Sequence, residues 1–432
     1  MIHSDSLSIK PNEPILLEDT NITHIEDQQL PNPCPIQVVL HLSPKIRCRV
    51  DSTKLPIQLM QGDFLKKPFS ITLQHHRQIK VRLGLYDPNS FFNGNPKDTF
   101  EGTLIPYRSP CTVVPPDAKI QSVRFGVLNF NEFYSKQDKF VTVDKTKIRL
   151  GSVTMQHDDW QIEATSVPNL GENLKILRRD GGYAITHTGT ISRSNNEAFS
   201  VEKIENILRG MQAFLSFSRG AGCGLTPVEG IDESGNKMPI IWGTSHTEPW
   251  TGRRHSWLPQ TDGGDSLSAA FSGFWSLYND SAWNEAIRKT IDWYTVSRTS
   301  PVHVGIVLAQ VALESLSHQI NGRKIKPVAK ALSEMLRKLS IDGKIPDYCE
   351  SLKDFASQNN LNNAPQIIAE IRNDMVHSER KHISLPAEVQ FNTLYLAQCY
   401  IEMVLLKKFE YCGRYLNRLK AVANEDPYEQ IF

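Results

Sequence analysis

The chain has 432 residues, with 48 Lys and Arg against 47 Asp and Glu, so its formal net charge is +1. Hydrophobic residues make up 40% and charged residues 22%, which is typical of a globular protein and too apolar for a disordered one. This near-zero net charge excludes a protein that binds nucleic acid through a positive potential over its whole surface. A local basic groove is still compatible with the net charge. The length predicts two or three domains.

The pattern of apolar residues and cysteines excludes further classes of protein. The longest apolar stretch, residues 304–313, is interrupted by Gln310 and falls far short of the roughly 20 residues of a membrane span. The N-terminus lacks the basic start and apolar core of a secretory signal. The 7 cysteines form no CxxC pair. We therefore expect a reduced, cytoplasmic protein with no membrane partner, no disulfide framework, no metal site and no cofactor.

The first half of the chain has the pattern of short strands. Residues 1–34 are polar, with scattered Pro and Asn, and predict an extended arm. Residues 35–245 predict a β-rich domain with an antiparallel, sandwich-like arrangement, because short apolar runs alternate with turn residues. A helix is expected over residues 199–217, where apolar residues recur at spacings of three and four. The candidate strands are residues 36–42, 69–73, 79–83, 122–130, 147–156, 160–165, 183–192, 223–229 and 237–242.

The second half of the chain has the pattern of helices. Residues 246–264 are rich in Gly, Pro and Trp and predict a linker. Residues 265–420 predict an all-α bundle, with prolines near the helix starts, and residues 421–432 predict a C-terminal tail. The predicted fold class is therefore α+β and multidomain. The candidate helices are residues 266–278, 281–298, 302–320, 326–340, 346–358, 364–381 and 386–411.

A polar motif near the end of one predicted helix suggests chemistry on RNA. Asn373 and His377 are four residues apart, so the amide can orient the imidazole. The imidazole can exchange a proton with a ribose 2′-OH or a leaving oxygen, and the Arg372 guanidinium can hold the phosphate. Arg372 and His377 lie about 140° apart around an ideal helix and roughly 7.5 Å apart along it. They can converge only if the helix end unwinds or a second copy contributes.

Alternative interpretations of the same residues stay open. His377 is also consistent with a surface histidine, and Arg372 with a structural ion pair, for which Glu314 is the obvious partner. Glu314 shares a polar stripe with Gln310 and His318 that is also typical of a solvated face. A second Arg-x4-His match, from Arg298 to His303, contains a proline and spans a helix boundary, so we interpret it as a chance match.

The Arg372, Asn373 and His377 motif, together with the earlier Ala-Leu-Glu314-Ser-Leu sequence, resembles the HEPN superfamily, and in particular the ApeA-like HEPN domains of bacterial anti-phage defence proteins. The resemblance covers residues 265–420. It implies a metal-independent endoribonuclease that works as a homodimer or higher homo-oligomer and acts in abortive infection. The resemblance also implies that the N-terminal domain inhibits the nuclease until a phage-derived trigger activates it. The active enzyme would then cleave tRNA or another RNA of translation. The implied catalytic residues are Arg372, Asn373 and His377, with Glu314 as a weaker match.

Two functions of other classes stay open beside the nuclease. HEPN folds also serve as non-catalytic modules that bind RNA or nucleotides, or that drive oligomerisation. An antitoxin-like partner of a nucleotidyltransferase is a further alternative. The long β-rich first domain disfavours it, because such partners are short helical proteins.

Overall fold

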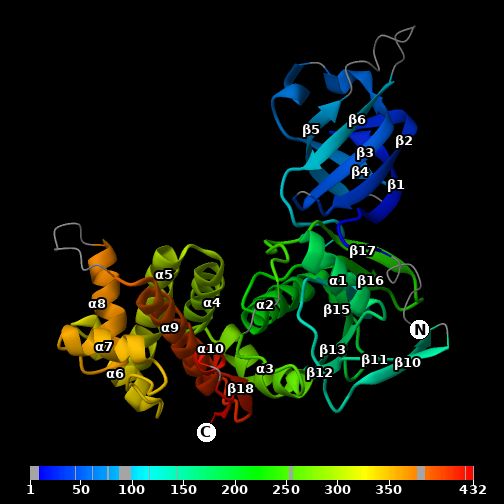
Figure 1. Ribbon diagram of the computed structural model, residues 1–432. Coiled ribbons are helices and arrows are strands. Elements are labelled where there is room, and N and C mark those ends of the chain that lie inside the picture. The colour runs from blue at the N-terminus through cyan, green and yellow to red at the C-terminus, as the bar shows by residue number, and fades with distance from the viewer. Residues whose placement is uncertain are drawn as a thin grey trace.

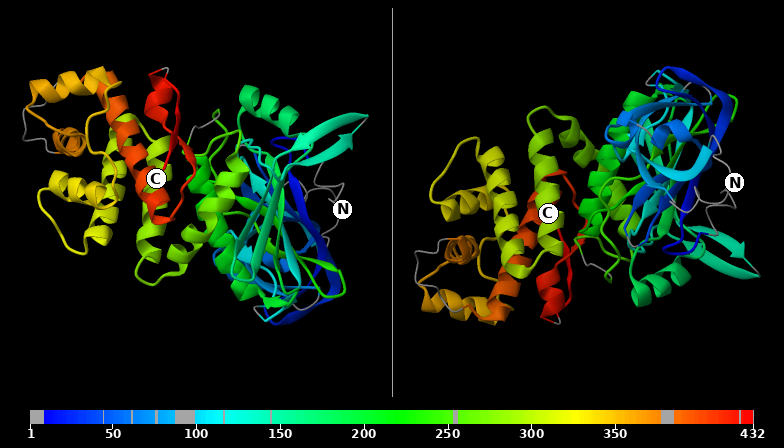
Figure 2. Two further views of the ribbon diagram at one scale, coloured as in Figure 1. Left: turned by 90° about the horizontal axis from the view of Figure 1, so that it is seen from below. Right: turned by 90° about the horizontal axis from the view of Figure 1, so that it is seen from above.

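The computed structural model describes residues 9–43, 45–60, 62–74, 77–86, 99–115, 117–143, 145–252, 256–376, 385–423 and 425–431. The chain forms an L, with a barrel at the end of one arm, a sheet at the corner and helices along the other arm (Figure 1). The two further views also show the β-rich part and the helical part at opposite ends (Figure 2). The predicted α+β layout, with a β-rich N-terminal part followed by helices, is confirmed.

The first part is a closed antiparallel barrel in which β4 closes onto β1. Buried and more exposed residues alternate along its strands, so that Ile36, Val38 and Leu40 fill the interior while Gln37 faces solvent. Closure pairs every barrel strand on both sides and leaves no open edge. In order around the barrel the strands are β1 (Ile15–Ile25), β2 (Gln28–His41), β3 (Arg47–Pro56), β6 (Thr99–Pro106), β5 (Gln78–Tyr86) and β4 (Phe69–Leu73), and the short helices η1 (Ile57–Met60) and η2 (Gly62–Leu65) precede β4.

The extended arm predicted for residues 1–34 is wrong in the part that the structure describes. Strand β1 and the first half of β2 lie within the barrel. Asn12, ahead of β1, is also fixed: its amide donates to the carbonyl of Gly181 at 3.0 Å, and its Oδ1 accepts from the amide of Tyr183 at 2.8 Å. Two register shifts along β1 interrupt the alternation that would have revealed a strand in the sequence.

A seven-stranded antiparallel sheet follows the barrel. The sandwich predicted for residues 35–245 is not present in the described parts of the chain, because the strands divide between the barrel and this sheet. Helix α2 (Val201–Arg219) packs on the sheet, and α1 (Leu170–Asp180) was not predicted. Across the sheet the strands are β12 (Ser152–His157), β13 (Trp160–Ser166), β14 (Ile185–Arg193), β9 (Ser122–Leu128), β16 (Leu225–Ile231), β17 (Lys237–Trp242) and β7 (Cys111–Thr112); the minor ladders join β10 (Lys139–Val143) to β11 (Thr146–Leu150) and β8 (Lys119–Ile120) to β15 (Phe199–Ser200).

The helical part follows its predicted elements closely. Pro301, Pro327 and Pro386 each stand just before the first residue of a helix, where a missing N–H costs little. In the described parts of the chain, no helix is both long and apolar enough to cross a membrane. The elements are α3 (Gly263–Asn279), α4 (Asn284–Thr299), α5 (Val302–Asn321), α6 (Val328–Lys338), α7 (Glu350–Gln358), α8 (Ala364–Val376), α9 (Ala387–Lys408), β18 (Arg414–Leu416), α10 (Arg418–Val422) and β19 (Tyr428–Gln430).

One hydrophobic core runs from the seven-stranded sheet into the helices. Its centre is aromatic: the ring of Phe217 on α2 stacks on Trp257 at 5.7 Å and lies 5.6 Å from the ring of Tyr294 on α4. Trp257 and Trp250 belong to the stretch predicted as a linker, yet both are buried. Trp257 belongs to this core and Trp250 to the core of the barrel, so both anchor the stretch that was predicted as a linker.

His187 on β14 makes the sheet sensitive to acid. Its ring is buried and stacks on Phe133 with 5.0 Å between ring centroids, and burial lowers its pKa to about 3. A histidine in the unfolded chain titrates near pH 6.5, so the folded state binds fewer protons in acid and its stability falls as the pH drops below that value. We expect the free energy of unfolding to fall by about 2 kcal/mol between pH 6.5 and pH 5, measured by urea denaturation.

The matched variants for this prediction are His187→Leu and His318→Ala. In His187→Leu the free energy of unfolding should depend less on pH over this range, because the buried imidazole that must stay neutral has been removed. The second removes an exposed histidine on α5 and should leave the pH dependence as in the wild type. An unchanged pH dependence in His187→Leu would contradict the assignment.

Candidate functional site

Three of the four predicted site residues lie on two helices that contact each other, α5 and α8. Arg372 and Asn373 lie in the last turn of α8, and Glu314 lies in the second half of α5. Ile367 and Ile371 are buried and hold α8 in the helical core. His377 lies outside the described residues, so its position relative to the other three stays a prediction.

Arg372 and Asn373 contact each other directly. The Arg372 Nη1 donates to Asn373 Oδ1 at 3.3 Å, while the Arg372 Nε is buried without a hydrogen-bond partner among the described residues. Glu314 accepts a hydrogen bond from Gln310 Nε2 at 2.8 Å on its own helix. In the described parts of the chain, no ion pair joins Arg372 to Glu314. The alternative in which Arg372 is bound in a structural bridge to Glu314 is therefore not observed there.

A cavity of about 500 Å³ opens where the start of α5 meets the end of α8. His303 contributes an exposed imidazole from α5, and Asp374 contributes a buried carboxyl from α8. An imidazole and a carboxyl group that line one concave site are each suitable for moving a proton. The other lining residues are Val304, Val307, Met375, Leu385 and Gln390.

The same face of α5 connects this cavity to Glu314. His303, Val307, Gln310 and Glu314 recur at spacings of four, three and four residues, so their side chains follow one another along one face of the helix. Gln310 on this face is buried, and its Oε1 has no hydrogen-bond partner among the described residues. The polar stripe that holds Glu314 is therefore not a fully solvated face.

His303 is the residue that sequence reasoning set aside. It belongs to the Arg-x4-His match interpreted as chance, and its arginine does lie elsewhere: Arg298 Nε donates to the carbonyl of Gly220 at 2.8 Å, beside the ring of Tyr294. The motif as a pair is thus not formed. Its histidine alone reaches the cavity beside the end of α8, a position that only the packing of α5 on α8 reveals.

A buried ionic network elsewhere in the helical part links α4, α9 and α10. The carboxyl of Glu402 is fully buried, lies 2.5 Å from Arg418 Nη2 and accepts a hydrogen bond from the hydroxyl of Tyr294. Burial raises the pKa of Glu402 to about 8, and the Arg298 guanidinium opposes the rise. Arg418 Nη1 also donates to Gln398 Oε1 at 3.0 Å. These contacts join α4, α9 and α10 to one another.

Comparison with known proteins finds two regions of the chain that match family models. The family model of the YopA C-terminal domain matches residues 280–429, and that of the YopA central domain matches residues 115–253. The chain is similar to the SPbeta prophage-derived uncharacterized protein YopA of Bacillus subtilis (strain 168), with 28% identity over 337 residues, 73% of this chain and 72% of the relative. No solved structure matches. The two matched regions correspond to the sheet and to most of the helical part, and the barrel precedes both.

Proposed function

We propose that this protein is a metal-independent endoribonuclease of the HEPN type that acts in abortive infection under the control of its N-terminal part. The observation that carries the proposal is that Arg372 and Asn373 directly precede Asp374, which lines a cavity with His303, on the helix pair that also bears Glu314. The similar protein of Bacillus subtilis is named as derived from a prophage, which is compatible with this setting.

The proposed chemistry needs only groups of the chain and of the RNA. A histidine takes the proton of a ribose 2′-OH, the oxygen attacks the adjacent phosphorus, and the 5′-oxygen of the next nucleotide leaves with a proton. Arg372 holds the phosphate and stabilises the charge that develops on it. The products are a 2′,3′-cyclic phosphate and a 5′-hydroxyl, and DNA is not a substrate because it lacks the attacking hydroxyl.

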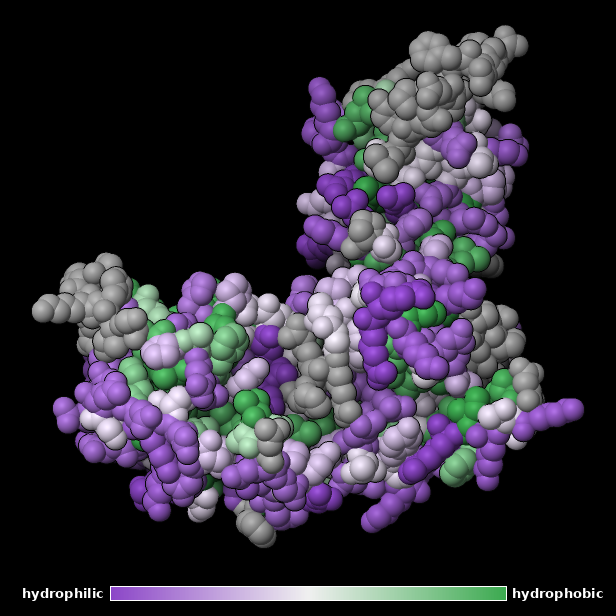
Figure 3. All heavy atoms as spheres, viewed as in Figure 1, coloured by the Kyte–Doolittle hydropathy of each residue, from purple (hydrophilic) through white to green (hydrophobic). Residues whose placement is uncertain are grey.

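An exposed apolar rim around the cavity supports the homodimer. Val304, Val376 and Phe391 are 38%, 47% and 46% exposed and lie near the start of α5, the end of α8 and the start of α9. Hydrophobic side chains also gather over the ends of α5 and α8 in Figure 3. Large apolar side chains grouped in this way are typical of an interaction site. A second copy on this rim would bring a second histidine motif to the same cavity.

A basic face of the barrel supports RNA as the partner. Arg47 and Arg49 on β3 and Lys80 and Arg82 on β5 alternate with buried residues, so they point outward. Tyr107 directly follows β6, the strand between them; it is 54% exposed, and Lys80 Nζ lies 5.9 Å from its ring centroid. Within the described residues, none of these four cations forms an ion pair. Unpaired cations around an exposed aromatic ring suit a single strand of nucleic acid.

The test of the proposal is the chemistry of cleavage. Purified protein should cut RNA in excess EDTA, leave single-stranded DNA intact and produce 2′,3′-cyclic phosphate ends, detected by sequencing before and after end repair. RNA binding without cleavage by the dimer, with or without a phage lysate as trigger, would instead favour the non-catalytic binding module. Cleavage that EDTA abolishes would overturn the proposed mechanism.

A further inference from the structure

A second cavity lies far from the proposed cleavage site, between α2 and the edge of the seven-stranded sheet. Its volume is about 190 Å³. Its walls come from three parts of the chain: α2, the strands β16 and β17, and the segment at β7 that continues from the barrel. A site enclosed by segments distant in the sequence is a typical ligand pocket, and this volume suits a ligand of nucleobase size.

The pocket has two apolar walls that face each other. Leu208 lines it from α2, and Val228 and Ile241 line it from the sheet. Branched aliphatic side chains on opposite sides of a narrow space favour a flat, apolar ring between them. The walls therefore suit the apolar body of a ligand, and the polar groups of the pocket suit its edge.

The carboxylate of Glu205 and the guanidinium of Arg209 both line this pocket. Glu205 accepts a hydrogen bond from the hydroxyl of Thr112, and its Oε2 lies 3.9 Å from Arg209 Nη1. A carboxylate offers about four acceptor positions, so Glu205 retains capacity for N–H donors of a ligand. Arg209 lies one helical turn further along α2 and offers donors to a carbonyl oxygen of the same ligand.

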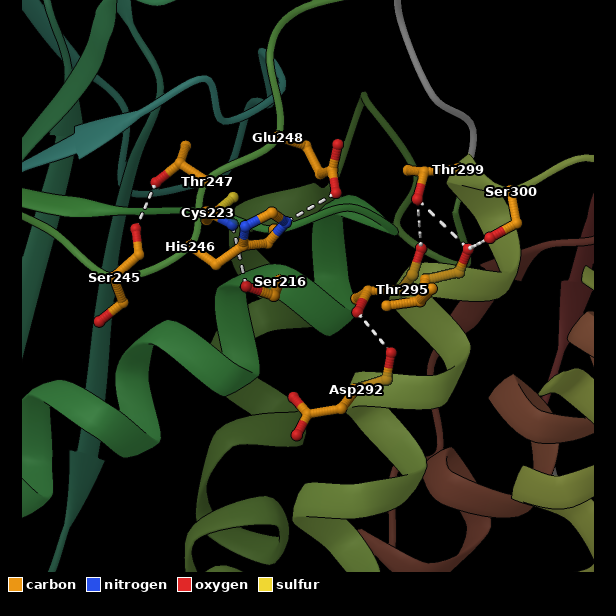
Figure 4. A network of polar contacts seen from close by, with 12 residues as sticks. Ser216, Cys223, Ser245, His246, Thr247, Glu248, Asp292, Thr295, Thr299 and Ser300 are labelled. Atoms are coloured by element: carbon orange, nitrogen blue, oxygen red, sulfur yellow. Dashed lines mark hydrogen bonds and ion pairs between the residues drawn. The ribbon is translucent and has the colours of Figure 1, made fainter. Parts of the chain in front are cut away.

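The loop that closes the pocket holds a hydroxyl without a partner. Thr244 lines the cavity, is 9% exposed, and its buried Oγ1 has no hydrogen-bond partner among the described residues. The loop itself is well fixed: Thr247 Oγ1 donates to the carbonyl of Ser245 at 3.1 Å, and the His246 ring lies 2.9 Å from Glu248 Oε1 (Figure 4). The fixed loop therefore forms a stable wall of the pocket.

We propose that this pocket binds a guanine base or nucleoside. Guanine presents two neighbouring N–H donors, N1–H and N2–H₂, which match the carboxylate of Glu205, and an adjacent O6 acceptor, which matches the guanidinium of Arg209. Adenine presents a donor beside an acceptor on the same edge and cannot give a carboxylate two N–H bonds. The ring lies between Leu208 and the sheet.

This site extends the proposed function, because α2 contacts both α3 and α4 of the helical part. A ligand held against Glu205 and Arg209 therefore acts on the helix that joins the sheet to the helices. Only its role as a signal to the nuclease rests on the proposed function. Binding itself does not, so a measurement of binding separates the two proposals.

The test is isothermal titration calorimetry of the full chain with guanosine, inosine and adenosine. Guanosine should bind at least 10-fold more tightly than inosine, which lacks the N2 amino group, and adenosine should bind weakest. Glu205→Gln should weaken guanosine binding at least 10-fold. Glu202→Gln, an exposed carboxylate one turn earlier on α2, is the matched control and should bind as the wild type does.

Circular dichroism shows whether each variant is folded. No binding of any of the three nucleosides to the wild type would overturn the proposal. Equal affinity for guanosine and adenosine, or undiminished guanosine binding by folded Glu205→Gln, would overturn it as well. Loss of RNA cleavage in a variant that still binds guanosine would bear on the proposed nuclease and not on this pocket.

Discussion

Replacing His377 with alanine is expected to lower the rate of RNA cleavage by about 10²- to 10⁴-fold, which is the range that a positioned general acid or base contributes. Arg372→Ala should cost about 10²- to 10³-fold, because the developing charge on the phosphate loses its donors. Arg372→Lys should recover only part of this loss, since an ammonium keeps the charge but not the forked pair of donors. The measurement is the initial rate of cleavage of a labelled RNA.

The matched control for both variants is His318→Ala, which removes an exposed histidine from α5, one turn beyond Glu314. It should cleave RNA at the wild-type rate. All variants should unfold at the wild-type urea concentration, because Arg372 makes a hydrogen bond only to its neighbour Asn373 among the described residues. If both His377→Ala and Arg372→Ala cleaved RNA at the wild-type rate, the catalytic role proposed for these two residues would be wrong.

Arg418→Ala is expected to destabilise the folded protein by about 3–5 kcal/mol, because it leaves the carboxyl of Glu402 buried without its closest cation. The pKa of Glu402 is already raised to about 8 by burial. Since the carboxyl titrates near 4.5 when unfolded and near 8 when folded, the stability that its bound proton contributes is fully present below about pH 4.5 and is lost as the pH rises through about 8. Without Arg418 the ionised form of the carboxyl also lacks its closest cation. The loss should therefore be larger at pH 9 than at pH 6.

The measurement is the urea midpoint of unfolding at the two pH values. Arg414→Ala, four residues earlier on β18, removes an exposed arginine that stacks on Tyr428 and should cost less than about 1 kcal/mol. A double variant that also carries Glu402→Gln should lose less than Arg418→Ala alone at pH 9. If Arg418→Ala and Arg414→Ala had equal stability, the network would not hold the helices as inferred.

The helices could be predicted from the sequence because the features that specify a helix lie within a few residues of one another along the chain. Predicted residues 302–320 and 386–411 became α5 (Val302–Asn321) and α9 (Ala387–Lys408), since apolar spacing and the preceding prolines act within a few residues. The motif of Arg372 and Asn373 was likewise found at the end of its predicted helix. Helix α1 (Leu170–Asp180) was missed among strand-like neighbours.

The barrel and the sites could not be predicted, because they depend on contacts between distant residues. Pairing of β1 with β4 closes the barrel across about 50 residues, and two register shifts hide the alternation of β1. His303 and Asp374 line one cavity only because α5 packs on α8. The amino-acid sequence by itself determined the helices and a candidate motif, since spacing along the chain decides both. Strand partners, the cavities and the burial of Glu402 were decided by the tertiary structure, where burial of apolar area joins segments that no local pattern relates.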